Sequence, residues 1–332
     1  MDAALAESRL TPAQTPASMR VSDAAGHARK LADAIQSVFL GQRETVSLLV
    51  VALLARGHAL VEDVPGVGKT TLAKALATCI DGKFSRVQLT PDLLPADLLG
   101  VSIYNAQTGD FDFKPGPIFA NIVVADEVNR TTPRTQSALL EAMAEQQVSV
   151  ENETRLLPPP FMVIATQNPF EFEGTYVLPE NQLDRFLVKV AVGYPDREIE
   201  RRILLERPGE AALAELTPVL DTQQVVGMQA AVEQVRIDQS VMDYLLDLIG
   251  RTRQDERFHL GVSPRGSLAL LGASRASALV DGRDYVIPDD VKSMFLPTAG
   301  HRVITRTYLS NGDAEAGRHV LQEILDSTSV PG

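Results

Sequence analysis

The sequence predicts a three-layer α/β domain built on a parallel sheet, followed by a smaller domain made of helices. Short runs of consecutive apolar residues are typical of parallel strands that are covered on both faces. These runs alternate with helical patterns, as they do in successive βαβ units. After Tyr194 the apolar runs stop and helical patterns continue along the chain. A length of 332 residues accommodates such an arrangement.

Composition and pattern divide the chain into three segments. Residues 1–22 are mostly Ala, Ser, Thr and Pro with little apolar periodicity, which predicts a mobile N-terminal tail. Residues 23–194 carry the alternating strands and helices and form the predicted α/β core. Residues 196–332 form the predicted all-helical domain. Hydrophobic residues make up 45% of the chain and charged residues 22%, as is ordinary for a globular protein with a buried core.

The core elements follow one another in a regular order. A helix is expected from about Asp23, and a second, strongly apolar helix precedes His58. Five strands with two intervening helices come next, and two hairpins interrupt them where apolar residues alternate around turn-forming residues. The strands are expected at residues 58–62, 84–90, 121–127, 161–169 and 186–193, the helices at 69–80 and 132–146, and the hairpins at about 100–115 and about 148–158.

The charge balance argues against nucleic acids and anionic membranes as binding partners. The formal net charge is −12, and the Lys and Arg residues are scattered, so phosphate groups are repelled rather than attracted. The single cysteine, Cys79, excludes an internal disulfide, and the five histidines lack the spacing of metal ligands. The start of the chain lacks a basic signal-peptide region, and no apolar run is long enough to span a bilayer. We therefore expect a cytoplasmic protein.

The stretch from Asp63 to Thr70 predicts a phosphate-binding loop. It nearly matches the pattern G-x-x-x-x-G-K-[ST], with Asp63 in place of the first glycine. A strand before the loop and a helix after it favour ATP binding over an ordinary glycine turn. Lys69 is expected to bridge the β- and γ-phosphates, and the Thr70 hydroxyl to bind Mg²⁺. The predicted nucleotide-binding residues here are Pro65, Gly66, Val67, Gly68, Lys69, Thr70 and Thr71.

Two acids follow the apolar run at residues 122–125. Asp126 and Glu127 come where that strand ends, and parallel sheets bind ligands at the carboxyl ends of their strands. Asp126 is expected to hold Mg²⁺ beside Thr70, and Glu127 to activate water as a general base. A kinase keeps water away from the γ-phosphate, so Glu127 favours hydrolysis. The alternative is a solvated strand end. Asn168, at the end of the next buried strand, is a further candidate for contacting the γ-phosphate, although Asn before Pro is often a turn residue.

Four ordered motifs give the chain a family resemblance. The stretches "EDVPGVGKT", "ADEVNRTTPRTQSALLEAMAEQ", "ATQNPFEFEGTYVLPENQLDRF" and "GVSPRG" together resemble the MoxR family of AAA+ ATPases, from about Asp33 to His319. The resemblance implies a P-loop core with a five-stranded parallel sheet and a helical lid domain. It also implies that the hairpin at about 100–115 is an insertion in helix 2, and that the one at about 148–158 precedes sensor 1. Asp63 and Asn181 depart from the usual family residues without removing a required charge.

The resemblance also assigns roles to individual residues. Arg185, in "LDRF", matches the arginine finger that reaches a neighbouring subunit's site, which implies a homo-oligomer, in this family a hexameric ring. A surface ion pair with Asp184 or Glu180 is the alternative. Arg265, in "SPRG", matches sensor 2 and acts in cis or in trans, while Arg130 is a candidate for the subunit boundary. The remaining assignments are Lys69 and Thr70 to Walker A, Asp126 and Glu127 to Walker B, Asn168 to sensor 1, and Gly41 and Gln42 to the segment against adenine.

The resemblance favours a chaperone-like remodelling ATPase. Such proteins act with a von Willebrand factor A domain partner on a client complex, in complex assembly or metal-cofactor insertion. Tyr104, Phe111 and Phe113 in the first hairpin are candidates for gripping a client, or for packing beneath the hairpin. A DNA-acting, helicase-like ATPase is one alternative, against which the acidic hairpin turns count. A chelatase ATPase subunit is the other, and it is mechanistically close to the first.

Overall fold

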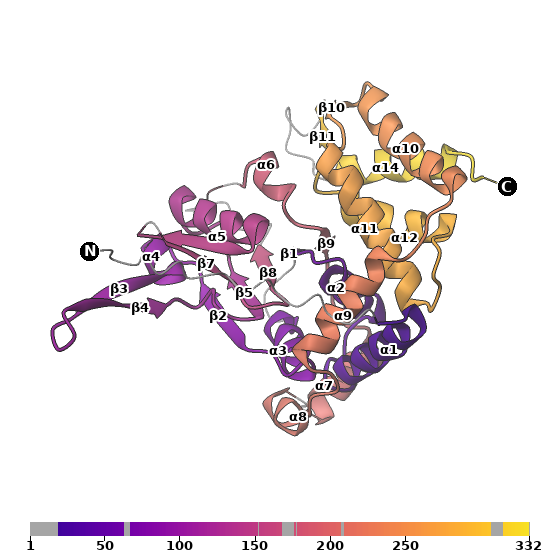
Figure 1. The fold of residues 1–332 in the computed structure, drawn as a ribbon. Coiled ribbons are helices and arrows are strands. Elements are labelled where there is room, and N and C mark those ends of the chain that lie inside the picture. The colour runs from indigo at the N-terminus through magenta and orange to yellow at the C-terminus, as the bar shows by residue number, and fades with distance from the viewer. Residues whose placement is uncertain are drawn as a thin grey trace, which may run out of the picture.

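The structure is a computed structural model, and its central element is a five-stranded sheet (Figure 1). The strand order is β2-β5-β8-β1-β9, and every neighbouring pair is parallel. The predicted fold class is therefore confirmed. The strands are β1 (Ala59–Glu62), β2 (Phe84–Gln88), β5 (Ile122–Asp126), β8 (Met162–Gln167) and β9 (Val188–Val190). The structure describes residues 19–62, 67–151, 153–167, 176, 178–206, 209–306 and 315–331.

Several sequence predictions fall outside the described residues. They include residues 1–18 of the predicted tail and residues 63–66 of the phosphate loop, among them Pro65 and Gly66. Asn168, the predicted sensor 1, also lies outside the described part of the chain. Their assignments stay sequence predictions.

Alternate residues of the central strand β5 enter two separate apolar layers. Ile122 and Val124 pack in the layer that contains α3, whereas Val123 and Ala125 pack in the layer that contains α5. Burial on both faces explains why the strand sequence is continuously apolar instead of alternating. The helices of the core are α3 (Lys69–Cys79), α4 (Pro95–Leu99), α5 (Pro133–Glu145) and α6 (Glu180–Leu183).

Two helices precede the sheet, α1 (Val21–Val38) and α2 (Arg43–Leu54). The sequence predicted a helix from about Asp23; helix α1 begins two residues earlier, so residues 21 and 22 are helical. Its buried residues recur at helical spacing, and this stripe contacts α3 of the core as well as α9 and α11 of the C-terminal region. The stripe consists of Ala24, Ala28, Leu31 and Ile35.

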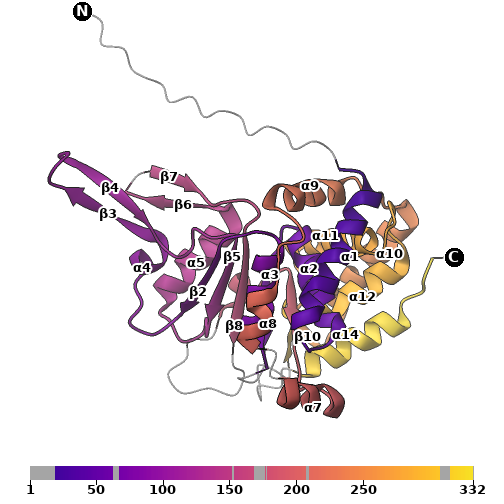
Figure 2. The same ribbon diagram turned by 90° about the horizontal axis from the view of Figure 1, so that it is seen from below.

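The C-terminal region is a group of helices at one end of the sheet (Figures 1 and 2). A short antiparallel ladder between β10 and β11 joins them, which the sequence did not predict because its strands are too short to show a pattern. No helix in the described part of the chain has the length and apolar character needed to cross a membrane. The elements are α7 (Arg197–Glu206), α8 (Gly209–Glu215), α9 (Thr222–Glu233), α10 (Gln239–Gln254), β10 (Phe258–Leu260), α11 (Pro264–Val280), α12 (Pro288–Ala299), β11 (Ile304–Thr305) and α14 (Glu315–Ser327).

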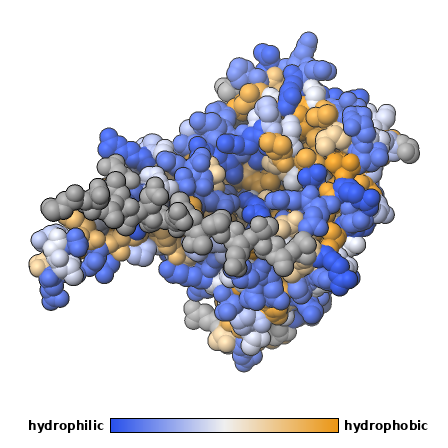
Figure 3. All heavy atoms as spheres, in the orientation of Figure 1, coloured by the Kyte–Doolittle hydropathy of each residue, from blue (hydrophilic) through white to orange (hydrophobic). Residues whose placement is uncertain are grey.

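Two antiparallel hairpins extend from the sheet domain on the side opposite the C-terminal helices (Figures 1 and 2). The first pairs β3 (Gly100–Asn105) with β4 (Asp110–Pro115), and the second pairs β6 (Gln147–Val150) with β7 (Glu153–Leu156). On the first hairpin, hydrophobic side chains lie among hydrophilic ones at the surface (Figure 3).

The three aromatic residues of the first hairpin have different environments. Phe113 packs edge-on against Phe119 and beneath the Arg155 guanidinium, which lies 4.0 Å from its ring centroid. Tyr104 and Phe111 contact each other across the strands but remain 58% and 68% exposed. Packing therefore accounts for Phe113, while Tyr104 and Phe111 are available at the surface.

His58 is a buried link between the first strand and two other elements. Val163 N–H donates to its Nδ1, so Nε2 carries the proton and donates to the Met143 carbonyl, each over 3.0 Å. Burial lowers the pKa of His58 to about 4. Burial, together with the neighbouring Arg302 charge, also lowers the pKa of His301 well below its ordinary value. Both imidazoles are therefore neutral in the folded chain near pH 7.

We predict that acidification destabilises the fold through these histidines. Between pH 6.5 and 4 the unfolded chain binds protons that folded His58 does not, so the stability present above pH 6.5 is lost as the pH falls. His58 alone should lower the free energy of unfolding by about 2 kcal/mol between pH 7 and 5. Urea titrations at both pH values should show a smaller loss in His58→Gln than in the wild type. His259→Gln, at an exposed position, should keep the wild-type pH dependence; an unchanged dependence in His58→Gln would contradict the prediction.

Candidate functional site

The helix α3 begins at the carboxyl edge of the sheet, where β1 ends. Gly68 caps it with a φ of +92°, a left-handed conformation in which a side chain is strained. Lys69, Thr70 and Thr71 form its first turn, and the N–H groups at a helix start carry partial positive charge. Because β1, β8 and β5 run parallel in one sheet, the predicted phosphate-binding turn after β1 and the predicted acids at the end of β5 lie at the same edge.

Phe39 joins the predicted adenine segment to this turn. A Cβ added at Gly41 would lie 2.1 Å from the Phe39 ring, and one added at Gly68 would lie 3.3 Å from it. The Gln36 amide holds the segment by donating to the carbonyls of Phe39 and Gly41, each over 3.0 Å. Gly41 and the neighbouring Gln42, at the N-cap position of α2, therefore lie beside the start of α3; their role against adenine stays a sequence prediction. No motif in the sequence distinguishes Phe39 from other apolar residues.

Asp126 is fixed by the strands on both sides of β5. From β8, the Thr166 hydroxyl donates to Asp126 Oδ1 over 3.1 Å. From β2, Arg86 Nε donates to Oδ2 over 2.6 Å. The carboxylate is only 10% exposed, so its orientation is set by these two contacts. Sequence reasoning missed Thr166 and Arg86, because only the order of the strands brings them to Asp126.

Glu127 turns away from the strand immediately after Asp126. Its φ of +58° is left-handed, and its backbone N–H donates to the Thr166 hydroxyl over 3.0 Å. Thr166 thus holds both acids at once, one through each of its hydrogen bonds. The Glu127 carboxylate lies 3.2 Å from Arg130 Nη1 and is about one-third exposed. The structure therefore gives the predicted base a cationic neighbour at an accessible position.

Arg185 lies elsewhere, after α6. Its guanidinium donates to the Leu140 carbonyl of α5, and it lines an open hollow with Glu141 and Glu145. Asp184 pairs with Arg302 instead. Among the described contacts Arg185 shares no partner with Asp126 or Glu127, so the structure does not bring the predicted finger and the predicted acids together within one chain.

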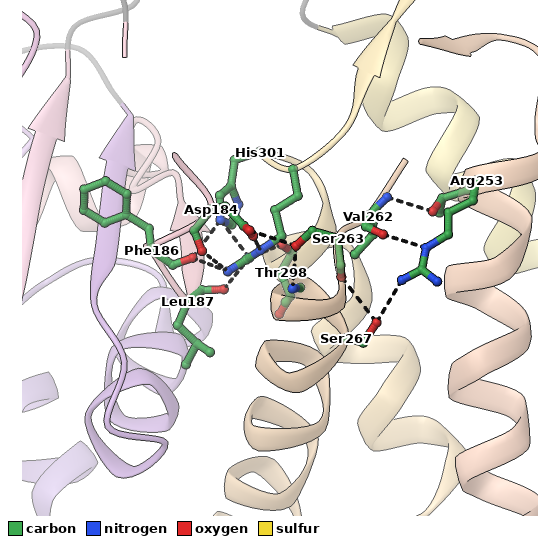
Figure 4. A network of polar contacts seen from close by, with 12 residues as sticks. Asp184, Phe186, Leu187, Arg253, Val262, Ser263, Ser267, Thr298 and His301 are labelled. Atoms are coloured by element: carbon green, nitrogen blue, oxygen red, sulfur yellow. Dashed lines mark hydrogen bonds and ion pairs between the residues drawn. The ribbon is translucent and has the colours of Figure 1, made fainter. Parts of the chain in front are cut away.

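Arg265 lies in the exposed first turn of α11. Ser263 caps this helix by accepting from Gly266 N over 3.0 Å, and its hydroxyl donates to Asp184 Oδ2 over 2.8 Å. The first turn of α11 is therefore joined to the residue before Arg185 (Figure 4).

The parallel sheet, the helix start at its carboxyl edge and the two fixed acids define a nucleotide-binding α/β core with an accompanying group of helices. Family models give the same class: residues 58–188 match "ATPase family associated with various cellular activities (AAA)", and residues 250–324 match "AAA lid domain". A crystal structure of a proposed ATPase from Cytophaga hutchinsonii superposes with a TM-score of 0.86 at 34% identity, covering 94% of this chain and 97% of that one.

Relatives that match along most of their length identify the family of AAA ATPases to which the chain belongs. The chain is 48% identical to the uncharacterized protein YeaC of Bacillus subtilis, covering 91% of this chain and 94% of that protein. It is 39% identical to Chaperone MoxR1 of Mycobacterium tuberculosis, covering 90% of this chain and 80% of that protein. The chain belongs to the MoxR family of AAA+ ATPases.

We predict that the Thr166 hydroxyl is needed to orient both acids. Thr166→Val keeps the shape of the side chain but removes the donor to Asp126 Oδ1 and the acceptor of Glu127 N–H, while Arg86 still donates to Asp126 Oδ2. Such a loss in a buried site costs about 1–3 kcal/mol, and ATP turnover should fall at least about ten-fold. Thr166→Ser, which keeps the hydroxyl, should retain most of the turnover. Steady-state phosphate release measures the turnover of both variants. A Thr166→Val rate equal to that of the wild type would show that the Thr166 hydroxyl is not needed to orient the acids.

Proposed function

We propose that the chain hydrolyses ATP at the carboxyl edge of its sheet. The observation that carries the proposal is the pair of adjacent acids with different settings: Asp126 is fixed and nearly buried, whereas Glu127 is turned outward and accessible. A fixed carboxylate suits a metal ligand, and an accessible one suits a base that takes a proton from water. Membership of an ATPase family supports the same conclusion.

The residues present fit a magnesium ion. Thr70 and Asp126 offer hard oxygen ligands, and Mg²⁺ sites use one or two such side chains together with phosphates and water. When bound, Mg²⁺ would neutralise charge that develops on the phosphates. Lys69 is proposed to contact the β- and γ-phosphates, and Asn168 the γ-phosphate and water. Within the described residues there is no group of three or more His, Cys, Asp or Glu side chains able to hold a metal ion.

We propose further that Arg185 serves the site of a neighbouring protomer. Its separation from Asp126 and Glu127 in the contacts of one chain, and its position in an open hollow, support a role in trans. An arginine that stabilises the transferred phosphoryl group contributes about 10³–10⁵ in rate. A head-to-tail contact of this kind closes into a ring, and we propose a hexamer. Arg265, at the start of α11, is proposed as sensor 2 on the lid.

The proposed task is chaperone-like remodelling of a client complex, including complex assembly or metal-cofactor insertion with a von Willebrand factor A domain partner. One relative is named a chaperone, and Tyr104 and Phe111 form an exposed aromatic pair on a projecting hairpin. A chelatase ATPase subunit is the alternative closest in mechanism. The DNA-acting alternative has less support, because Asp110 and Asp112 lie on β4 and Glu151 lies in the turn of the second hairpin.

A matched pair of variants separates nucleotide binding from turnover. Lys69→Ala should lose nucleotide affinity, because no other side chain of the helix start replaces its charge. Glu127→Gln should bind ATP with near wild-type affinity but turn over at least about 100-fold more slowly. Fluorescent-nucleotide titration and steady-state phosphate release provide the two measurements. Lys74→Ala, on the same helix, is the control. Normal turnover in Glu127→Gln would contradict the assignment of Glu127 as the base.

Mixing two inactive chains tests the action of Arg185 across a boundary. Arg185→Ala keeps Lys69, Asp126 and Glu127, whereas Glu127→Gln keeps Arg185. If the finger acts in trans, mixed assemblies should regain turnover at the sites of the Arg185→Ala chains. Arg236→Ala, an exposed arginine in a lid ion pair, should remain active alone. Co-assembly shown by mass photometry without any recovery, at every mixing ratio, would indicate action in cis.

A further inference from the structure

The backbone around Arg185 is held by a single buried arginine from the C-terminal region. The Arg302 side chain is only 2% exposed. Its Nη2 donates to the carbonyls of Asp184 and Phe186 over 3.1 and 2.6 Å. Those two carbonyls belong to the residues directly before and directly after Arg185. The guanidinium therefore holds the backbone carbonyls of the two residues next to the proposed finger.

The remaining donors of Arg302 complete the contact between the sheet and the helices. Nε donates to Asp184 Oδ1 over 2.7 Å. Nη1 donates to the carbonyls of Leu187, directly before β9, and Thr298, in α12. A guanidinium offers five donors in a rigid plane, so a shift of the segment 184–187 relative to α12 breaks several of these bonds together. Figure 4 shows Asp184, Phe186 and Leu187 facing Thr298 and His301 across this contact.

The same aspartate also holds the start of α11. Its second oxygen, Oδ2, accepts from Ser263 Oγ, which in turn caps the helix through Gly266 N. Arg302 packs directly on this turn, because a Cβ added at Gly266 would lie 2.8 Å from Arg302 Cδ. Arg265 stands between these two contact points. One connected set of contacts therefore reaches the proposed finger and the proposed sensor.

We infer that Asp184, Arg302 and Ser263 are positioning residues, which form a clasp that fixes Arg185 and the first turn of α11 relative to each other. The inference rests on the proposed function of Arg185. Its consequence is that rotation of the α11 helix start displaces the finger offered to the neighbouring site. Displacing a catalytic group by about 1 Å costs on the order of 10²-fold in rate.

The test uses Asp184→Asn, which keeps the side-chain size and removes the charge that orients Arg302. Nucleotide affinity of this variant should stay within about two-fold of the wild type, while turnover should fall at least about ten-fold. Mixed with Glu127→Gln, whose finger is intact, the Asp184→Asn chain should regain part of its turnover. Mixed with Arg185→Ala, it should stay inactive, because neither chain then offers a positioned finger.

Asp290→Asn is the matched control for lost stability. Asp290 is 3% exposed and accepts two hydrogen bonds from Arg283, yet this pair lies within the C-terminal helices and does not contact Asp184 or Phe186. At equal folded fraction, judged by thermal melting, Asp290→Asn should keep turnover within about two-fold of the wild type. An equal loss in both variants would attribute the effect to weakened helices and overturn the inference.

Ser263 provides a second variant should Asp184→Asn fail to fold. Ser263→Ala leaves the buried ion pair but removes the bridge to α11, and turnover should fall about three-fold, with recovery in Ser263→Thr. Unchanged turnover in Ser263→Ala would overturn the inference. Two mixtures separate the clasp from the proposed function. If turnover recovers when Arg185→Ala is mixed with Glu127→Gln but not when folded Asp184→Asn is mixed with Glu127→Gln, the clasp is overturned and the proposed function stands. No recovery in either mixture would overturn the action in trans itself.

Discussion

Burial of the central strand on both faces determines where chemistry is available in this molecule. All five residues of β5 are buried, and its apolar side chains fill two layers. Polar groups in such a strand are costly unless they are paired, so they gather where the strand ends. Asp126 is the last residue of β5 and is paired from both neighbouring strands. The site therefore results from the packing of the sheet as much as from the identity of its acids.

The contact between the sheet and the C-terminal helices follows a different principle. It includes a cation, Arg302, that is almost wholly withdrawn from water, and withdrawing an ion costs several kcal/mol before its partners offset the cost. Apolar side chains of similar volume often stabilise such a contact equally well. The ion pair instead sets the orientation of the C-terminal helices relative to the sheet, because its fixed hydrogen-bond acceptors are compatible with few arrangements of the two. Asp184 and three backbone carbonyls of the segment 184–187 define that arrangement.

The sequence predicted the parts of the fold that local pattern specifies. Continuous apolar runs located β5 and β8, the alternation of strand-like and helical segments located the other three strands, and the change of pattern after Tyr194 indicated the helical region. Pattern did not reveal the strand order, so the contacts of Thr166 and Arg86 with Asp126 were out of reach. Arg302 had no signal either, because a single arginine after a helix is usually exposed. Only contacts between residues distant in sequence gave these side chains a role.

The ring of Phe39 has a consequence for how the two ends of the fold communicate. Phe39 follows directly on α1, which packs on α9 and α11 as well as on α3. Its ring occupies the space that a Cβ at Gly41 would fill and lies beside Gly68, the residue before α3. Helix α1 therefore connects the C-terminal helices to the start of α3, and the Phe39 ring lies at the end of α1 next to the proposed nucleotide site. A tilt of the C-terminal helices would therefore act on α1 and, through Phe39, on the segment proposed to lie against adenine.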